Sequence, residues 1–202
     1  MLDALIQHQA NAYRASTALV NEMNKQFTTE SNAFVSSLRD ILDDLTESEK
    51  RALTAGKYNT DRLKDFKSAF DDWYQSIAIT LPVLFLASAA AYVAIESGFI
   101  AKIYDGVADI TADKVVDRFK TTPVASGALF NELFKDLAQS ARNQALYAIR
   151  EGINSGLTNQ EIIAELRGKR TKVGDKYIYV GGIVEQTKDK IDANVRTARS
   201  AL

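Results

Sequence analysis

The sequence predicts a mainly α fold, a helical bundle with long helices and one small antiparallel β-hairpin near the C-terminus. The 202 residues include only two prolines and ten glycines, and so few helix breakers favour long helices over a turn-rich β fold. Apolar residues recur three or four positions apart along much of the chain, as on one face of a helix. The run 177–180 follows a Gly-Asp-Lys turn and has the residue types of a strand.

Residues 2 to about 45 are expected to form one or two helices with a heptad-like apolar seam, interrupted near Thr28 to Ser31. The seam contains Val20, Met23, Phe27, Phe34, Leu38, Ile41 and Leu45. A seam of this kind occurs in bundle helices that pack on their own domain and in oligomeric coiled coils. The polar interruption and the small number of heptads favour the bundle helix.

Two helix N-caps are expected after residue 45, at Thr46 and Thr60. Thr46 and Glu49 have the spacing of a capping box, which starts a short helix by satisfying free backbone N–H groups. The sequence AGKYNT ends this helix, and Thr60 is the expected cap of a helix that begins at Asp61. Four apolar residues share one face of that helix: Leu63, Phe66, Phe70 and Trp73.

Residues 73–95 carry no charge over 23 positions, which is long enough to span the hydrocarbon core of a bilayer. One interpretation is membrane insertion, and the other is a central helix buried within the protein. Pro82, the many alanines and the lack of closely flanking Lys or Arg favour burial. We therefore expect residues 77–95 to lie inside the fold.

The stretch 99–120 is amphipathic and charged, and a helix is expected from about 128 to 154. Gly156 is suited to end that helix in a left-handed conformation. Thr158 and Glu161 form a second capping box, which starts a helix over 159–166.

The remaining residues predict a β-hairpin and a last helix. Val173 and the run 177–180 flank the turn residues Gly174-Asp175-Lys176, and Gly181-Gly182 ends the second strand. The last helix begins near Ile183. Its apolar face contains Val184, Ile191, Val195 and Ala198.

This ordered combination resembles the head-morphogenesis (minor head protein) family of tailed bacteriophages over roughly residues 140–202. The matching residues before the hairpin are Ile149, Arg150, Gly152, Gly156, Leu157, Thr158, Glu161, Ile162 and Leu166. The hairpin contributes Gly181 or Gly182, and the last helix contributes Val195, Arg196, Thr197 and Ala198. The chain thus divides into an N-terminal helical region, 1–125, and a head-morphogenesis-like helix/hairpin/helix region, 126–202. Family members usually continue past the last helix, so no activity of such an extension is implied for this chain.

The resemblance implies a structural virion protein that acts at the portal end of the capsid, in head assembly, DNA packaging or DNA delivery. The implied partners are the portal or other head proteins and the packaged DNA, with the protein oligomeric in the particle. The implied locations are the capsid interior or portal vertex, and the host cytoplasm during assembly. Two alternatives stay open: a membrane-active DNA-ejection protein that inserts residues 73–95, and a general helical scaffold or adaptor.

The sequence offers no arrangement for catalysis or metal binding. Cysteine is absent, which excludes disulfides, thiolate metal sites and cysteine nucleophiles, and His8 is the single histidine. Phosphate-binding glycine motifs and the zinc-protease motif are absent as well. Two pairs of adjacent carboxylates occur, at 43–44 and at 71–72. Neighbouring side chains on a helix point about 100° apart, so neither pair is suited to general acid–base catalysis. We expect no enzyme activity, no metal and no cofactor.

Charge is uneven along the chain: the net charge is −1, but residues 141–202 carry +4 and residues 1–140 carry −5. Tyr177 and Tyr179 alternate on the expected strand among basic residues, a combination that binds single strands or phosphates. The alternative, which we expect, is that the tyrosines pack the hairpin onto the last helix. The candidate contacts to a partner or to DNA are Arg170, Lys172, Tyr177, Tyr179, Arg196 and Arg199.

Overall fold

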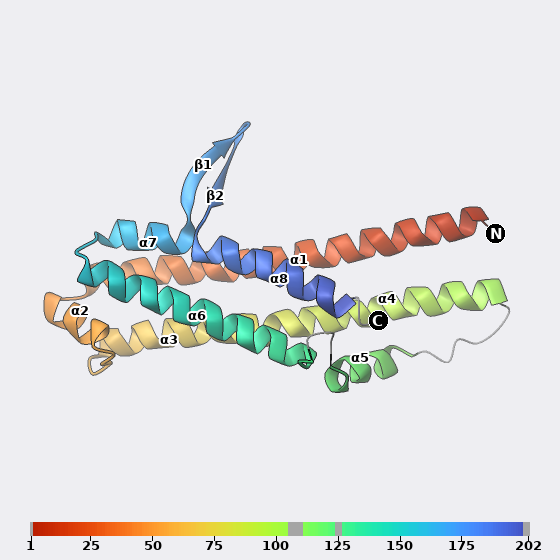
Figure 1. Cartoon of the computed structure of the whole chain (residues 1–202), viewed down its shortest axis with the longest axis horizontal. Coiled ribbons are helices and arrows are strands. Elements are labelled where there is room, and N and C mark those ends of the chain that lie inside the picture. Colours follow the sequence, from red (N-terminus) through yellow and green to blue (C-terminus); the bar gives the residue numbers. More distant parts are fainter. Residues whose placement is uncertain (1, 105–110, 124–126, 200–202) are drawn as a thin grey trace.

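The computed structural model describes residues 2–104, 111–123 and 127–199, and it confirms the expected fold of long helices with one two-stranded antiparallel hairpin (Figure 1). The helices are α1 (Leu2–Asp44), α2 (Glu47–Thr54), α3 (Asp61–Gln75), α4 (Leu81–Tyr104), α5 (Ala112–Thr121), α6 (Phe130–Asn154), α7 (Asn159–Arg167) and α8 (Ile183–Arg199). A π-helical segment, η1 (Ser76–Thr80), joins α3 to α4. The strands are β1 (Lys169–Val173) and β2 (Lys176–Val180).

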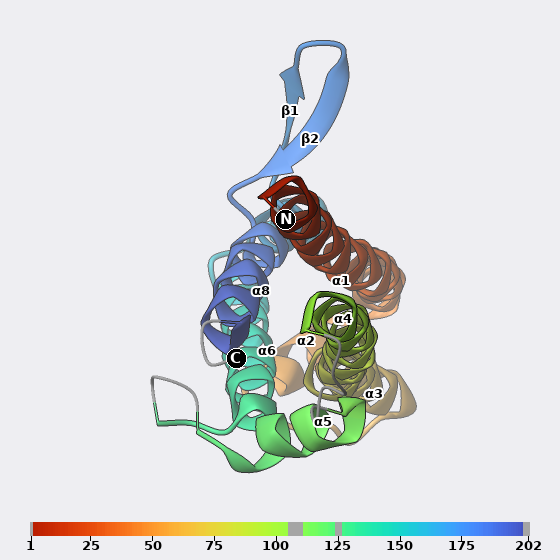
Figure 2. The same ribbon diagram turned by 90° about the vertical axis from the view of Figure 1, so that its right-hand side faces the viewer.

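The bundle is organised around α1, which runs along its length and contacts α3, α4, α7 and α8. Viewed along the long axis, α1 and α4 lie on one side and α6 and α8 on the other (Figure 2). The apolar seam of α1 packs into this core, with Met23, Phe27 and Leu38 buried. The expected bundle helix is therefore confirmed for this part of α1.

One continuous core joins the N-terminal and C-terminal regions. The rings of Phe85 on α4 and Phe130 on α6 lie 4.5 Å apart, and Phe130 also contacts Phe134. Val184, Ile191 and Val195 of α8 are buried in the same cluster, as their spacing predicts. The apolar face of α8 is thus used within the chain's own fold.

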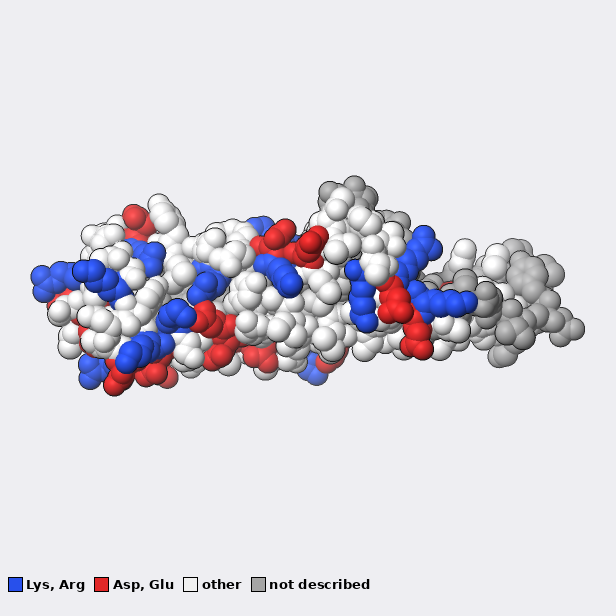
Figure 3. Space-filling model, turned by 90° about the horizontal axis from the view of Figure 1, so that it is seen from below, with Lys and Arg blue, Asp and Glu red and all other residues white. Residues whose placement is uncertain are grey.

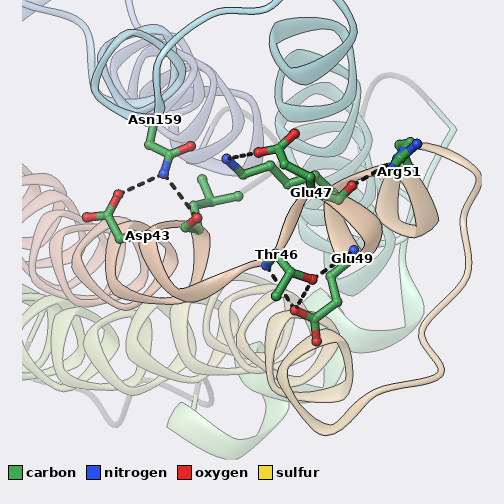
Figure 4. Close-up of polar contacts among 8 residues, drawn as sticks. Asp43, Thr46, Glu47, Glu49, Arg51 and Asn159 are labelled. Atoms are coloured by element: carbon green, nitrogen blue, oxygen red, sulfur yellow. Dashed lines mark hydrogen bonds and ion pairs between the residues drawn. The ribbon is translucent and has the colours of Figure 1, made fainter.

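The capping box at α2 is confirmed (Figure 4). The carboxylate of Glu49 accepts hydrogen bonds from the backbone N–H of Thr46 at 3.0 Å, from the hydroxyls of Thr46 and Thr60, and from Arg62. These donors, the Thr46 backbone N–H foremost, lower the pKa of Glu49 to about 2 because they favour the charged carboxylate. Thr60 caps α3 as expected, by accepting from the N–H of Leu63.

The same end of the bundle ties α7 to α1. Asn159 donates through its amide to the carbonyl of Leu42 at 3.0 Å and to the carboxylate of Asp43 at 2.7 Å (Figure 4). The capping box of Thr158 and Glu161 is confirmed beside it, and its hydrogen bonds lower the pKa of Glu161. The start of α7 is therefore held by its own capping box and by hydrogen bonds to α1.

The uncharged segment is buried on one face only, so the expectation for residues 77–95 is correct in part. Its buried face repeats every fourth residue and contains Ile77, Leu81, Phe85, Ala89 and Val93. Ile79, Val83 and Ile95 are each at least half exposed. The helical stretch Asp61–Ala101 is long and apolar enough to cross a membrane, and only 39% of its most apolar window is buried.

The amphipathic stretch 99–120 includes the end of α4 and most of α5. In the structure, α4 extends to Tyr104 and a separate helix, α5, starts after Thr111, whose hydroxyl accepts from the N–H of Lys114. Residues 105–110 between them lie outside the described part of the chain. Thr111 caps α5 without a capping box, because Lys114 occupies the position where a capping box has Glu or Gln.

Candidate functional site

The hairpin of β1 and β2 is the candidate site because it projects away from the bundle (Figures 1 and 2). Its strands pair antiparallel with Lys172 opposite Tyr177 and Arg170 opposite Tyr179. Every residue of both strands is exposed except Tyr179, which is half-buried. An isolated two-stranded hairpin is only marginally stable in water, so its contacts at the base matter.

Four of the candidate contact residues lie on one face of this hairpin. Directly opposed residues and residues two apart on a strand share a face, which places Arg170, Lys172, Tyr177 and Tyr179 together. We call these four residues the basic-aromatic face. The guanidinium of Arg170 lies 4.2 Å from the centre of the Tyr177 ring, a cation–π distance.

The expectation that the tyrosines pack the hairpin onto the last helix is wrong for Tyr177. Its side chain is 57% exposed, and its ring contacts the guanidinium of Arg170 on the neighbouring strand. Tyr179 is half-buried, and its ring lies under the guanidinium of Arg167 at the end of α7, at 4.6 Å. The hairpin is therefore held at its base and free along its length.

Arg167 is the residue that sequence reasoning missed. Besides covering Tyr179, it donates to the amide oxygen of Asn32 on α1 at 2.8 Å, so it links the hairpin base to the longest helix. A basic residue in the last turn of a helix is common because it complements the helix dipole. No local signal distinguishes Arg167 from that ordinary role.

Two glycines bring the ends of the hairpin into backbone contact. Gly168 has φ +94°, which favours glycine, and a Cβ there would lie 2.8 Å from the carbonyl oxygen of Val180. A Cβ on Gly182 would overlap the backbone of Gly168 and of Arg167. Gly181 has φ +81° and ends β2 as expected. The hairpin thus leaves and re-enters the bundle at one point.

The remaining family-motif residues are spread over the fold and shape its backbone. Arg150 on α6 is partly buried and donates to the hydroxyl of Tyr58 at 3.0 Å, joining α6 to the loop before α3. Gly156 ends α6 with φ +71°, as expected. Thr158 and Glu161 cap α7 at the end opposite the hairpin. Gly156, Thr158 and Glu161 shape helix ends, Arg150 links α6 to a loop, and the four residues do not converge on one site.

The candidate contacts on α8 are not part of the basic-aromatic face. Arg196 is exposed and lies about 20 Å along the helix from Ile183, at 1.5 Å per residue. Thr197 and Arg199 belong to α8, but their side chains lie outside the described part of the structure. The candidate contacts therefore form two separate sites, the basic-aromatic face of the hairpin and Arg196 on α8.

On the opposite side of the bundle, the described residues mix charges of both signs. Figure 3 views the molecule from below, where Lys and Arg are interspersed with Asp and Glu. Asp71 pairs with both Lys67 and Arg142. Within the described residues, no group of three His, Asp or Glu side chains could hold a metal ion.

A second surface feature is an apolar groove between α1 and α4, with a volume of about 520 Å³. Small side chains line much of it, including Ala15, Ala18 and Ala89, with Glu22 as its acidic residue. Toward the helix ends, the imidazole of His8 forms a hydrogen bond with the carboxylate of Glu96 at 2.8 Å and stacks on the ring of Phe99.

Comparisons of the chain with protein-family models, curated proteins and solved structures found no match.

Proposed function

We propose that this chain is a structural bacteriophage virion protein, a minor head protein that acts at the portal end of the capsid in head assembly, DNA packaging or DNA delivery. The observation that carries the proposal is the ordered series over residues 140–202 that resembles that family. The fold is compatible with it, because a rigid helical body with a projecting arm suits a structural role. No catalytic arrangement is part of the proposal.

The portal and other head proteins are its proposed partners, and the C-terminal region is proposed to make the contact. The apolar face of α8 cannot be that contact, because Val184, Ile191 and Val195 are buried in the chain's own core. Deleting residues 183–202 would therefore disturb the fold as well as docking. Arg196 is exposed and offers a cleaner probe, since an arginine can pair with carboxylates of a partner.

The test is mass spectrometry of purified particles and assembling heads, with chemical cross-linking to locate neighbours. We expect few copies per particle and cross-links to the portal. Arg196→Glu should reduce incorporation, whereas Lys57→Glu, an equal charge reversal at an exposed site after α2, should not. Absence of the protein from both particles and assembling heads would exclude the proposed role. A copy number close to that of the main shell protein would indicate a scaffold or cement protein instead.

A membrane-active ejection protein is the second candidate, and the exposed apolar surface of α4 favours it. Val83 and Ile95 of α4 are exposed, as is Ile79 of η1, and all three lie in the helical stretch Asp61–Ala101, which is long enough to span a bilayer. The measurement is flotation of the purified native protein with liposomes at neutral pH. The first proposal predicts that the protein stays in the soluble fraction without detergent. Quantitative flotation would favour the ejection role.

A further inference from the structure

The hairpin carries a concentrated positive charge on an otherwise slightly acidic chain. Residues 169–180 contain four basic side chains and one acidic one, a net charge of +3, against −1 for the whole chain. All four cations, Lys169, Arg170, Lys172 and Lys176, are exposed. This charge stands on an arm clear of the bundle (Figure 1), so a large polyanion can approach it without meeting the acidic body.

The chemistry of the basic-aromatic face matches phosphate. Arg170 and Lys172 are donors only, and Tyr177 and Tyr179 add hydroxyls that can donate. Phosphate oxygens only accept, and they bind such donors with charge-assisted hydrogen bonds. The carboxylate of Asp175 lies in the turn, outside this face. The face therefore presents donors without a competing carboxylate.

The shape of the arm favours duplex DNA over single strands or an acidic protein. A two-stranded β ribbon fits the major groove of B-DNA. One side of the Tyr177 ring is covered by Arg170, which reduces the aromatic surface available for stacking an unpaired base. Lys169 and Lys176 lie on the other face, so both faces of the hairpin carry cations.

We propose that the β1–β2 hairpin is a sequence-independent DNA-binding arm that contacts the phosphate backbone of duplex DNA through Arg170 and Lys172, with Lys169 and Lys176 flanking them. The inference rests on the proposed function for its setting, the DNA packaged in the head. The binding itself is a property of the purified chain. DNA binding by the hairpin can therefore be disproved while the virion role stands, and the virion role can be disproved while DNA binding stands.

The experiment measures fluorescence anisotropy of a labelled random-sequence DNA duplex with the full chain as salt is raised. Four phosphate contacts predict a slope of log K against log salt of about −3.6, or about 150-fold weaker binding between ~50 and 200 mM. Arg170→Ala with Lys172→Ala should reduce the slope to about −1.8, or about 12-fold over the same range. The control is Lys57→Ala with Lys135→Ala, which removes two exposed cations elsewhere and should leave the slope unchanged.

Competition assays separate the alternatives. Poly-L-glutamate at equal charge concentration should compete poorly, and an unlabelled single strand should bind more weakly than the duplex. The inference is overturned if the wild-type chain does not bind duplex at low salt, or if the control pair weakens binding as much as the hairpin pair. Equal competition by poly-L-glutamate would assign the arm to an acidic protein partner, and tighter binding of the single strand would reject the duplex. Far-UV circular dichroism of each variant verifies folding, and Arg170→Gln with Lys172→Gln provides a second pair.

Discussion

Gly182→Ala is expected to lower the free energy of unfolding by more than about 3 kcal/mol. Inserting a group into packed structure costs about 1–3 kcal/mol when neighbouring side chains can shift. Here the new Cβ would overlap the backbone of Gly168 and Arg167, which cannot rotate away. The backbone is also held on both sides, because Leu166 of α7 and Val184 of α8 are buried in the core. Relief of the clash must therefore disturb the bundle.

The measurement is urea unfolding followed by the helical circular dichroism signal, with Gly174→Ala as the matched control. Gly174 lies at the hairpin tip with φ +60° and nothing within 4 Å of a Cβ, so its substitution introduces only left-handed backbone strain of about 1–2 kcal/mol. That strain is confined to the exposed arm and should barely change the unfolding of the bundle. Equal, small effects of the two substitutions would show that the close approach at Gly182 is not rigid.

The elements that were predicted correctly are those encoded by neighbouring residues. The capping boxes at Thr46 and Thr158 each lie within four residues, and the burial of α8 follows from its apolar spacing. The direction of the hairpin depends instead on Gly168 meeting Gly182, fourteen positions away. The glycines were visible in the sequence, but their contact was not. The expectation that Tyr177 packs on α8 was wrong for the same reason.

The α4 segment shows a second limit of sequence reasoning. Its residues are apolar around the whole helix, so the spacing of apolar positions does not mark one face for burial. The packing of α1 and α6 decides that Phe85 faces the core and Val83 faces outward. Arg167 is comparable, because its role depends on the approach of Asn32, 135 positions earlier. These contacts are long-range, and no local pattern specifies them.

Trp73→Ala is expected to cost about 3–5 kcal/mol of unfolding free energy, the range for removing a large buried aromatic side chain. Trp73 is 3% exposed and stacks on Phe34 of α1, with ring centres 4.4 Å apart and planes nearly parallel. Its indole N–H donates to the hydroxyl of Ser31 at 3.0 Å, and Ser31 is itself buried. The side chain therefore joins α3 to α1 by both packing and a hydrogen bond.

Two milder substitutions separate those contributions. Trp73→Phe keeps an aromatic ring against Phe34 but leaves the Ser31 hydroxyl without its donor, and Ser31→Ala leaves the indole N–H unpaired. An unpaired buried polar group costs about 1–3 kcal/mol, so both variants should lie below the loss from Trp73→Ala. Circular dichroism is the required probe, because Trp73 is the single tryptophan and Trp73→Phe abolishes its fluorescence. If Trp73→Phe destabilised the protein as much as Trp73→Ala, the polar contact would dominate, contrary to the packing argument. A double-mutant cycle on Trp73 and Ser31 would then measure their coupling directly.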